Sequence, residues 1–474
     1  MMNKKSFLIL ALVALLALPT VAMAAAEFSL GGYIKLDVFW DSTQENKNMN
    51  GLIARNNTND FHHGRLKFTS QSSRFNFTIK GPKLWGANTT GFIEMDFDQG
   101  TESGLAAVNG NGAARGASNA YTPRLRHAFF RFDWPETELL LGQYFTFMSK
   151  WFPETAQDGP FQLTGTPTAR MPMIKLVQRF LGAWEVGLMV GDANEITNGR
   201  AFSAAANQND RGGGQSTEAP QVQAHVMFAK DLYGKAAWYG KPTPFTAEVN
   251  FAWQRGITAD AARALLATNQ NNFTAFAGFT RNQYHDPWMV QGVLFIPVIP
   301  THSANLAGTA SLQTTWWIGQ GVEAFGMTSF GSQVFRFTGQ RADGALFFDA
   351  TLMSRFGGQV QGQYYFNNQW FLTAAYGMSR AFNVGAFQTQ IGNNVPNNRV
   401  NVFAGDAADL HQEFNLCLWY RPITAFKFGL QYAYNRTDFF QKAGVVNAAG
   451  DLVGGTKTNL GEAHRVEFVG LFFF

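Results

Sequence analysis

Apolar and polar side chains alternate with a period of two in many short segments of this chain. In 34–38 and 93–97, charged residues at every second position oppose three apolar side chains, and in 360–366 glutamines take the polar positions. A period of two indicates β-strands with one polar face. A soluble β-sandwich and a membrane β-barrel share this pattern, so the composition has to decide between them.

The composition favours the membrane barrel. Only 15% of the 474 residues are charged, and 15% are aromatic, whereas a typical soluble domain has about 25% charged residues. No apolar run of about 18 or more residues occurs in the body of the chain, which excludes a helical membrane protein. A single cysteine, Cys417, excludes a disulfide scaffold. The net charge of +4 gives little support for a nucleic-acid partner.

The C-terminal segment shows the alternation most clearly. Phe474, Phe472 and Phe468 share one face, and Arg465 and Glu467 point to the other. In water, such a strand would be prone to aggregate. In a closed barrel one face meets lipid and the other meets the lumen.

The N-terminal segment has the features of a secretory signal peptide. Two lysines precede an apolar stretch over 7–18 that is too short to span a bilayer. Small residues follow and predict cleavage after Ala24 or Ala26. We therefore expect 1–24 to be a cleaved export signal and 27–474 to form one barrel domain.

The fold class predicted is all-β, a transmembrane antiparallel β-barrel of sixteen strands. The strands are predicted at 28–40, 63–81, 89–98, 124–134, 139–148, 173–180, 184–192, 221–231, 246–256, 288–299, 309–323, 345–366, 370–380, 413–422, 426–436 and 464–474. Two of them, 63–81 and 345–366, are long for single strands, and splitting both would give eighteen.

Short connections alternate with long ones along the chain. The short ones are 85–88, 135–138, 181–183, 367–369 and 423–425, and the long ones are 41–61, 99–123, 149–172, 192–220, 256–287, 381–412 and 437–463. In outer-membrane barrels the periplasmic turns are short and the external loops long, which places both termini on the periplasmic side. With about sixteen strands the lumen is too wide for side chains to fill, so we expect an aqueous channel.

The signal peptide, the alternating strands and the aromatic C-terminal strand together resemble those of Gram-negative outer-membrane porins, which are sixteen-stranded trimeric barrels. The resemblance implies that Phe468, Phe472 and Phe474 are read by the barrel-assembly machinery. It also implies a homotrimer among outer-membrane lipid and lipopolysaccharide, and a third external loop, 149–172, folded into the pore. This loop shares only Pro153-Glu154 with the acidic Pro-Glu-Phe-Gly stretch of general-diffusion porins.

Charged residues near the expected constriction form the candidate site. Acids on the loop and bases on the facing wall would create a transverse field that orients solutes. The acidic candidates are Glu154 and Asp158, and the basic ones are Arg131, Lys80, Lys35 and Arg465 on the wall and Arg170 and Lys175 at the loop exit. The alternative for each residue is that it is an ordinary lumen charge in contact with water. In either case the bases are expected to face the lumen, because Arg or Lys facing lipid at the midplane costs about 2–4 kcal/mol.

These features predict a porin for the passive diffusion of small hydrophilic solutes and ions. Two alternatives stay open: a substrate-selective channel in which the wall bases favour anions, and a barrel sheath around a multihaem cytochrome in an electron-transfer conduit. An enzyme is the weakest interpretation, because no spacing of Ser, His and Asp indicates a catalytic triad. No cofactor is expected, since Gly110, Gly112 and Gly116 miss the dinucleotide-binding spacing by one residue. No metal is expected either, because His62-His63 lies on a predicted loop, where adjacent histidines are more often solvated than metal-bound.

Overall fold

A computed structural model describes residues 26–43, 64–99, 122–157, 161, 164–193, 218–257, 276–278, 284–327, 333–340, 346–382, 408–439, 444–446, 452–455 and 460–474. The predicted signal peptide, Asp158 and His62-His63 lie outside these residues. No helix in this described part has the length and apolar character needed to cross a membrane.

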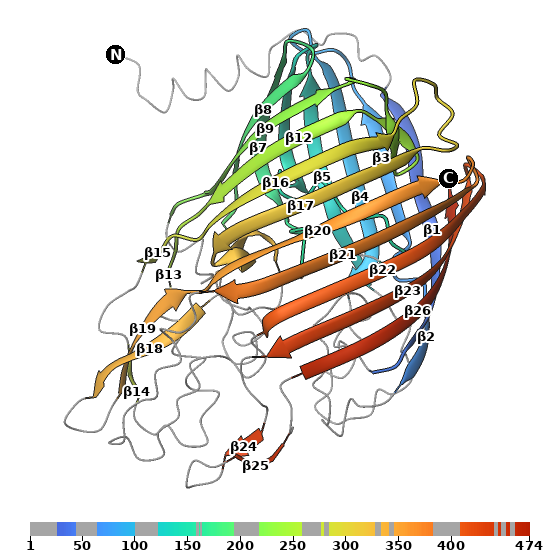
Figure 1. Cartoon of the computed structure of the whole chain (residues 1–474). Coiled ribbons are helices and arrows are strands. Elements are labelled where there is room, and N and C mark those ends of the chain that lie inside the picture. Colours follow the sequence, from blue (N-terminus) through green and yellow to red (C-terminus); the bar gives the residue numbers. More distant parts are fainter. Residues whose placement is uncertain are drawn as a thin grey trace, which may run out of the picture.

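One sheet closes on itself to form a barrel (Figure 1). On one edge, β1 (Glu27–Asp41) pairs with the last strand, β26 (Leu460–Phe473). On its other edge β1 pairs with β2 (Arg65–Thr69) and then β3 (Arg74–Lys80), which follow one another along it. Together β2 and β3 are one interrupted strand, so the barrel has sixteen strands, all antiparallel. This confirms the predicted fold class and strand number.

The remaining barrel strands follow around the wall in chain order. They are β4 (Asn88–Gln99), β5 (Thr122–Asp133), β6 (Thr137–Phe145), β7 (Arg170–Phe180), β8 (Trp184–Gly191), β9 (Gln221–Lys230), β12 (Phe245–Trp253), β16 (Trp288–Ile299), β17 (Ala310–Gln320), β20 (Ser354–Tyr365), β21 (Trp370–Phe382), β22 (Ala408–Ile423) and β23 (Phe426–Phe439).

Short elements lie outside this series. They are β10 (Ala236–Trp238), β11 (Lys241–Thr243), β13 (Gly256–Ile257), β14 (Phe276–Gly278), β15 (Tyr284–His285), β18 (Gln333–Gln340), β19 (Leu346–Leu352), β24 (Gly444–Val446), β25 (Leu452–Gly455) and the 3-10 helix η2 (Val322–Phe325). The predicted strand over 345–366 is wrong in its first part, because β19 pairs with β14 and β18 in a separate sheet. The barrel strand β20 begins at Ser354, after the carbonyl of Met353 accepts a hydrogen bond from the backbone N–H of Gly321.

Side chains on the barrel strands alternate between two environments. On β1, Ile34 is 58% exposed on the outer face, whereas the neighbouring Lys35 is 3% exposed and points inward. On β23 the same contrast holds for Leu430, at 56%, and Gln431, at 1%. The outer surface is therefore apolar and the interior polar, as the alternation predicted.

The two ends of the barrel differ. The turns 81–87, 134–136, 181–183, 366–369 and 424–425 are all short and lie at the end that also holds both ends of the described chain. We call this end the turn end and the opposite one the loop end. The separate strands β18, β19, β24 and β25 lie beyond the loop end, at the bottom of Figure 1.

Candidate functional site in the barrel lumen

We call the connection between β6 and β7, residues 146–169, the pore loop; its described residues, 146–157, 161 and 164–169, lie inside the barrel. At its base, the backbone N–H of Thr146 donates to the carbonyl of Ala169 at 3.2 Å. The N–H of Ala169 in turn donates to Ser149 Oγ at 2.9 Å. From this base the described residues of the loop contact lumen-facing side chains on strands from β12 to β23. These contacts place the loop in the lumen, as the resemblance implied.

The first anchor of the pore loop is Trp151. Its indole Nε1 donates to Glu248 Oε2 on β12 at 2.8 Å, and its ring stacks on Phe295 of β16 with centroids 6.0 Å apart. Nearby, Gln291 Nε2 donates to the carbonyl of Met148 at 3.0 Å. A hydrogen-bonded tryptophan with a buried ring fixes this part of the loop in position and orientation.

The second anchor is Glu154, which is 3% exposed. Gln361 of β20 binds its backbone on both sides, at 3.2 Å to the N–H and 3.3 Å to the carbonyl. Thr373 Oγ1 also donates to this carbonyl, at 3.0 Å. The carboxylate accepts from Gln363 Nε2 at 2.9 Å and pairs with Lys427 of β23. These contacts tie Glu154 to the wall; its role as an eyelet acid stays a prediction.

The third anchor joins the loop to β1 and β23. Lys35 Nζ donates to the carbonyl of Ala156 at 2.7 Å and forms an ion pair with Asp37 at 2.8 Å. The N–H of Ala156 donates to Gln431 Oε1 at 2.8 Å. Lys35, predicted as a wall base of the constriction, therefore holds the loop backbone.

Two glycines on the wall let the loop approach closely. A Cβ added at Gly377 would lie 2.5 Å from the Phe161 ring, and one at Gly357 would lie 2.6 Å from the Thr164 carbonyl. That carbonyl accepts a hydrogen bond from Trp317 Nε1 at 2.9 Å. Glycine within a strand often marks such close backbone approach, so the loop and wall fit together only with glycine at these two positions.

Strands β3, β4, β5 and β7 carry a cluster of charged residues. We define the arginine cluster as Arg74, Arg124, Arg126 and Arg170, together with the carboxylates of Glu94 and Asp96. Asp96 pairs with Arg124 at 2.7 Å and with Arg126 at 2.6 Å. Glu94 pairs with Arg126 at 2.7 Å and lies 3.7 Å from Arg74.

Arg170 lies in a different environment from the other three arginines of the cluster. Its guanidinium lies 5.4 Å from the centroid of the Phe145 ring, and it makes no ion pair with any residue in the described ranges. Four guanidinium groups thus face two carboxylates, which leaves the arginine cluster with a formal net charge of +2. Side chains of Arg74 and Arg124 stay 21% and 25% exposed, so these two arginines are the open part of the cluster, whereas Arg126 and both carboxylates are buried.

A second charged group lies on the same wall nearer the turn end. Glu138 is its centre, with Lys175 at 3.7 Å, Arg179 at 3.6 Å and Arg131 at 4.0 Å. Arg131 also pairs with Asp133 at 2.8 Å. The structure therefore brings the predicted bases Arg131 and Lys175 together, around a carboxylate that the sequence analysis did not select.

Two other predicted bases lie apart from both groups. Lys80 is largely exposed at the turn end and pairs with Glu27 at 3.2 Å. Arg465 is buried and pairs with Asp41 at 2.6 Å, at the loop-end limit of β1. The predicted assembly residues Phe468, Phe472 and Phe474 are exposed; their role in assembly stays a prediction.

The sequence analysis missed Lys427 and five of the six members of the arginine cluster as site residues, all but Arg170. Arg124 and Arg126 flank Leu125, which is exposed on the outer face, so their spacing of two was a signal for inward-facing bases. Lys427 stands between Phe426 and Phe428 in the same way. Its partner Glu154 is 273 residues away in the chain, and no local pattern indicates that pairing.

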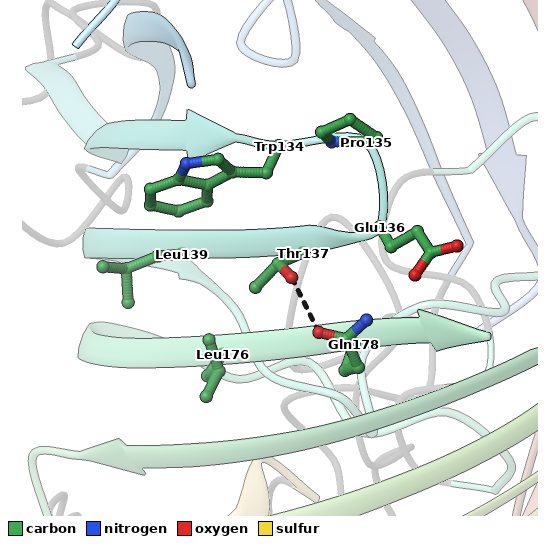
Figure 2. A pocket seen from close by; sticks show the side chains of 7 residues that line it. All are labelled: Trp134, Pro135, Glu136, Thr137, Leu139, Leu176 and Gln178. Carbon is green, nitrogen blue, oxygen red and sulfur yellow. Dashed lines mark hydrogen bonds between the residues drawn. The ribbon is translucent and has the colours of Figure 1, made fainter. Parts of the chain in front are cut away.

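A hollow at the turn end is separate from the lumen. Figure 2 shows its lining, with Leu139, Leu176 and Trp134 around a hydrogen bond between Thr137 and Gln178 of 2.7 Å. Leu139 and Leu176 lie on the outward positions of β6 and β7, so this hollow faces the surroundings of the barrel. Within the described residues, no group of His, Cys, Asp or Glu is arranged to hold a metal ion.

Comparisons with known proteins support the fold. No protein-family model matches this chain, and no curated protein matches it. Among solved structures, it is similar to the outer membrane channel DcaP of Acinetobacter baumannii, with a TM-score of 0.60 and 14% identity over 95% of this chain and 98% of that one. The anion-selective porin from Comamonas acidovorans matches with a TM-score of 0.49 and 10% identity, over 95% and 100% of the two chains. The likeness to DcaP shows a shared barrel fold.

Proposed function

We propose that this chain, which has the barrel fold of an outer-membrane channel, is an outer-membrane porin for the passive diffusion of small hydrophilic solutes and ions. The observation that carries the proposal is the pore loop, which crosses the lumen and is anchored on the far wall. A loop held in this way narrows a wide barrel to a defined passage. The apolar outer surface supports a place in lipid.

The arginine cluster supports a preference for anions. It presents a net positive charge on the wall formed by β3 to β7, and the carboxylate of Glu154 is neutralised by Lys427 on the other side. A charged ring or patch in a narrow water-filled passage favours ions of the opposite sign. The substrate-selective alternative is therefore included in our proposal, as an anion-favouring porin.

The other functional interpretations receive less support. A sheath around a multihaem cytochrome would need a lumen free for a partner, whereas the pore loop of this chain occupies part of it. We include a homotrimer in lipopolysaccharide-containing outer membrane in the proposal, on the basis of the porin resemblance. An enzymatic role is not proposed.

Liposome swelling tests the proposal. Vesicles containing the purified protein should take up small sugars and swell, at rates that fall with solute size. Solutes of matched size and opposite charge should enter at different rates, the anionic one faster. If these vesicles swell no faster than protein-free vesicles, the proposal that this chain is a porin is refuted.

A further inference from the structure

The connection between β9 and β12 is an exception among the turn-end connections, because it contains a hairpin of its own. β10 and β11 pair from Ala236–Thr243 to Trp238–Lys241. The two-residue turn between them has Tyr239 at φ 49° and Gly240 at φ 71°. Both values are left-handed, as tight hairpin turns require, but this backbone is uncommon for a side chain as bulky as tyrosine. A strained residue of this kind often marks a functional constraint.

The hairpin is folded inward. Ala236 and Ala237 are fully buried, and the carbonyl of Ala237 accepts a hydrogen bond of 2.9 Å from Ser311 Oγ, on the lumen face of β17. At its base the backbones of Lys235 and Thr301 exchange two hydrogen bonds, of 2.8 and 2.7 Å. Residues 235–243, which we call the inner hairpin, are thus fixed against the interior wall at the turn end.

The inner hairpin contacts the pore loop. The hydroxyl of Tyr239 donates to the carbonyl of Pro153 at 2.9 Å, one residue before the Glu154 anchor. The ring of Trp238 lies 5.5 Å from Trp151 and 5.9 Å from Phe295, measured between centroids. The pore loop enters from the loop end, and the inner hairpin meets it from the turn end.

We infer that the inner hairpin is a second constriction element, which positions the pore loop and confines the solute path to the wall formed by β3 to β7. The inference rests on the proposed function, because it assigns a part of the channel. Two elements that enter from opposite ends and meet at Trp151 and Pro153 cover the wall from β12 to β23. Lumen-facing residues there, such as Gln361 and Gln363, are buried, whereas Arg74 and Arg124 of the arginine cluster keep 21% and 25% of their side chains exposed.

Single-channel recording in planar bilayers tests the inference with two variants. Trp238→Ala removes the ring that contacts both Trp151 and Phe295 and should raise the conductance. Tyr239→Phe removes only the hydroxyl that donates to the Pro153 carbonyl. Because this contact positions the pore loop, the variant should show a fluctuating single-channel current where the unaltered protein shows a steady open level. Tyr233→Phe is the matched control, since Tyr233 lies just before the inner hairpin, is 44% exposed, and should leave both properties unchanged.

The outcomes separate this inference from the proposed function. If the unaltered protein forms no channels, the porin proposal fails. If it forms steady channels and both variants record the same conductance and current noise, the inner hairpin has no part in the pore and the inference is wrong. Tyr239→Phe keeps the ring and the fold, so it decides the question even where Trp238→Ala does not assemble.

Discussion

Replacing Arg170 by alanine should weaken the preference for anions. The change lowers the formal net charge of the arginine cluster from +2 to +1. Two unit charges about 8 Å apart in water interact by about 0.5 kcal/mol, and each ~1.4 kcal/mol corresponds to a tenfold ratio. Losing the charge changes the energy of an anion and of a cation by this amount in opposite directions, a difference of about 1 kcal/mol. We therefore expect the anion-to-cation permeability ratio to fall about fivefold.

The reversal potential under a KCl gradient in a planar bilayer measures this ratio. Arg170→Lys keeps the charge and is the matched control, with an unchanged ratio expected. The effect should shrink at high salt, because the screening length falls from about 10 Å at 0.1 M to about 3 Å at 1 M. If Arg170→Ala has the same ratio as the unaltered protein at low salt, ions do not pass the arginine cluster and the reasoning is refuted.

Three further predictions concern the pore loop and the barrel. Lys427→Met leaves the buried carboxylate of Glu154 without its cation, at a cost of about 3–5 kcal/mol, so heat unfolding followed by gel shift should occur at lower temperature. Adding Glu154→Gln should restore most of the loss, and no recovery would contradict the pairing. Gly377→Val would collide with Phe161, where a Cβ lies 2.5 Å from the ring, and should make the pore loop cleavable by added protease. Gly362→Val, where a Cβ meets nothing within 4 Å, should stay protected, and equal protection of both variants would argue against the close fit. Phe474→Ala should reduce the amount of heat-modifiable barrel in the outer membrane relative to Phe28→Ala, another exposed outer phenylalanine; equal amounts would exclude a role in assembly.

The sequence predicted the barrel wall well, because polar inward and apolar outward side chains alternate within each strand. Lys35 and Gln431 are inward and Ile34 and Leu430 outward, as their alternation indicated. The error over 345–366 arose because β19 has strand character too, but pairs outside the barrel. Local alternation reports that a segment is a strand and does not report which sheet it joins.

The contacts between side chains inside the lumen were less predictable from the sequence. Contacts across it, such as Glu154 with Lys427, depend on the path of a loop through space and on the register of distant strands. Lys35 was correctly expected to face inward, but its hydrogen bond to Ala156 could not be read from its neighbours. The inner hairpin was missed because its short strands have few residues in which alternation could show.

Single-channel conductance of the purified protein in a planar bilayer shows whether this barrel encloses an open, narrowed and positively charged passage. We expect discrete, steady conductance steps with a reversal potential on the anion side. A protein that inserts into the bilayer and passes no current, or one whose current favours cations, would contradict this expectation.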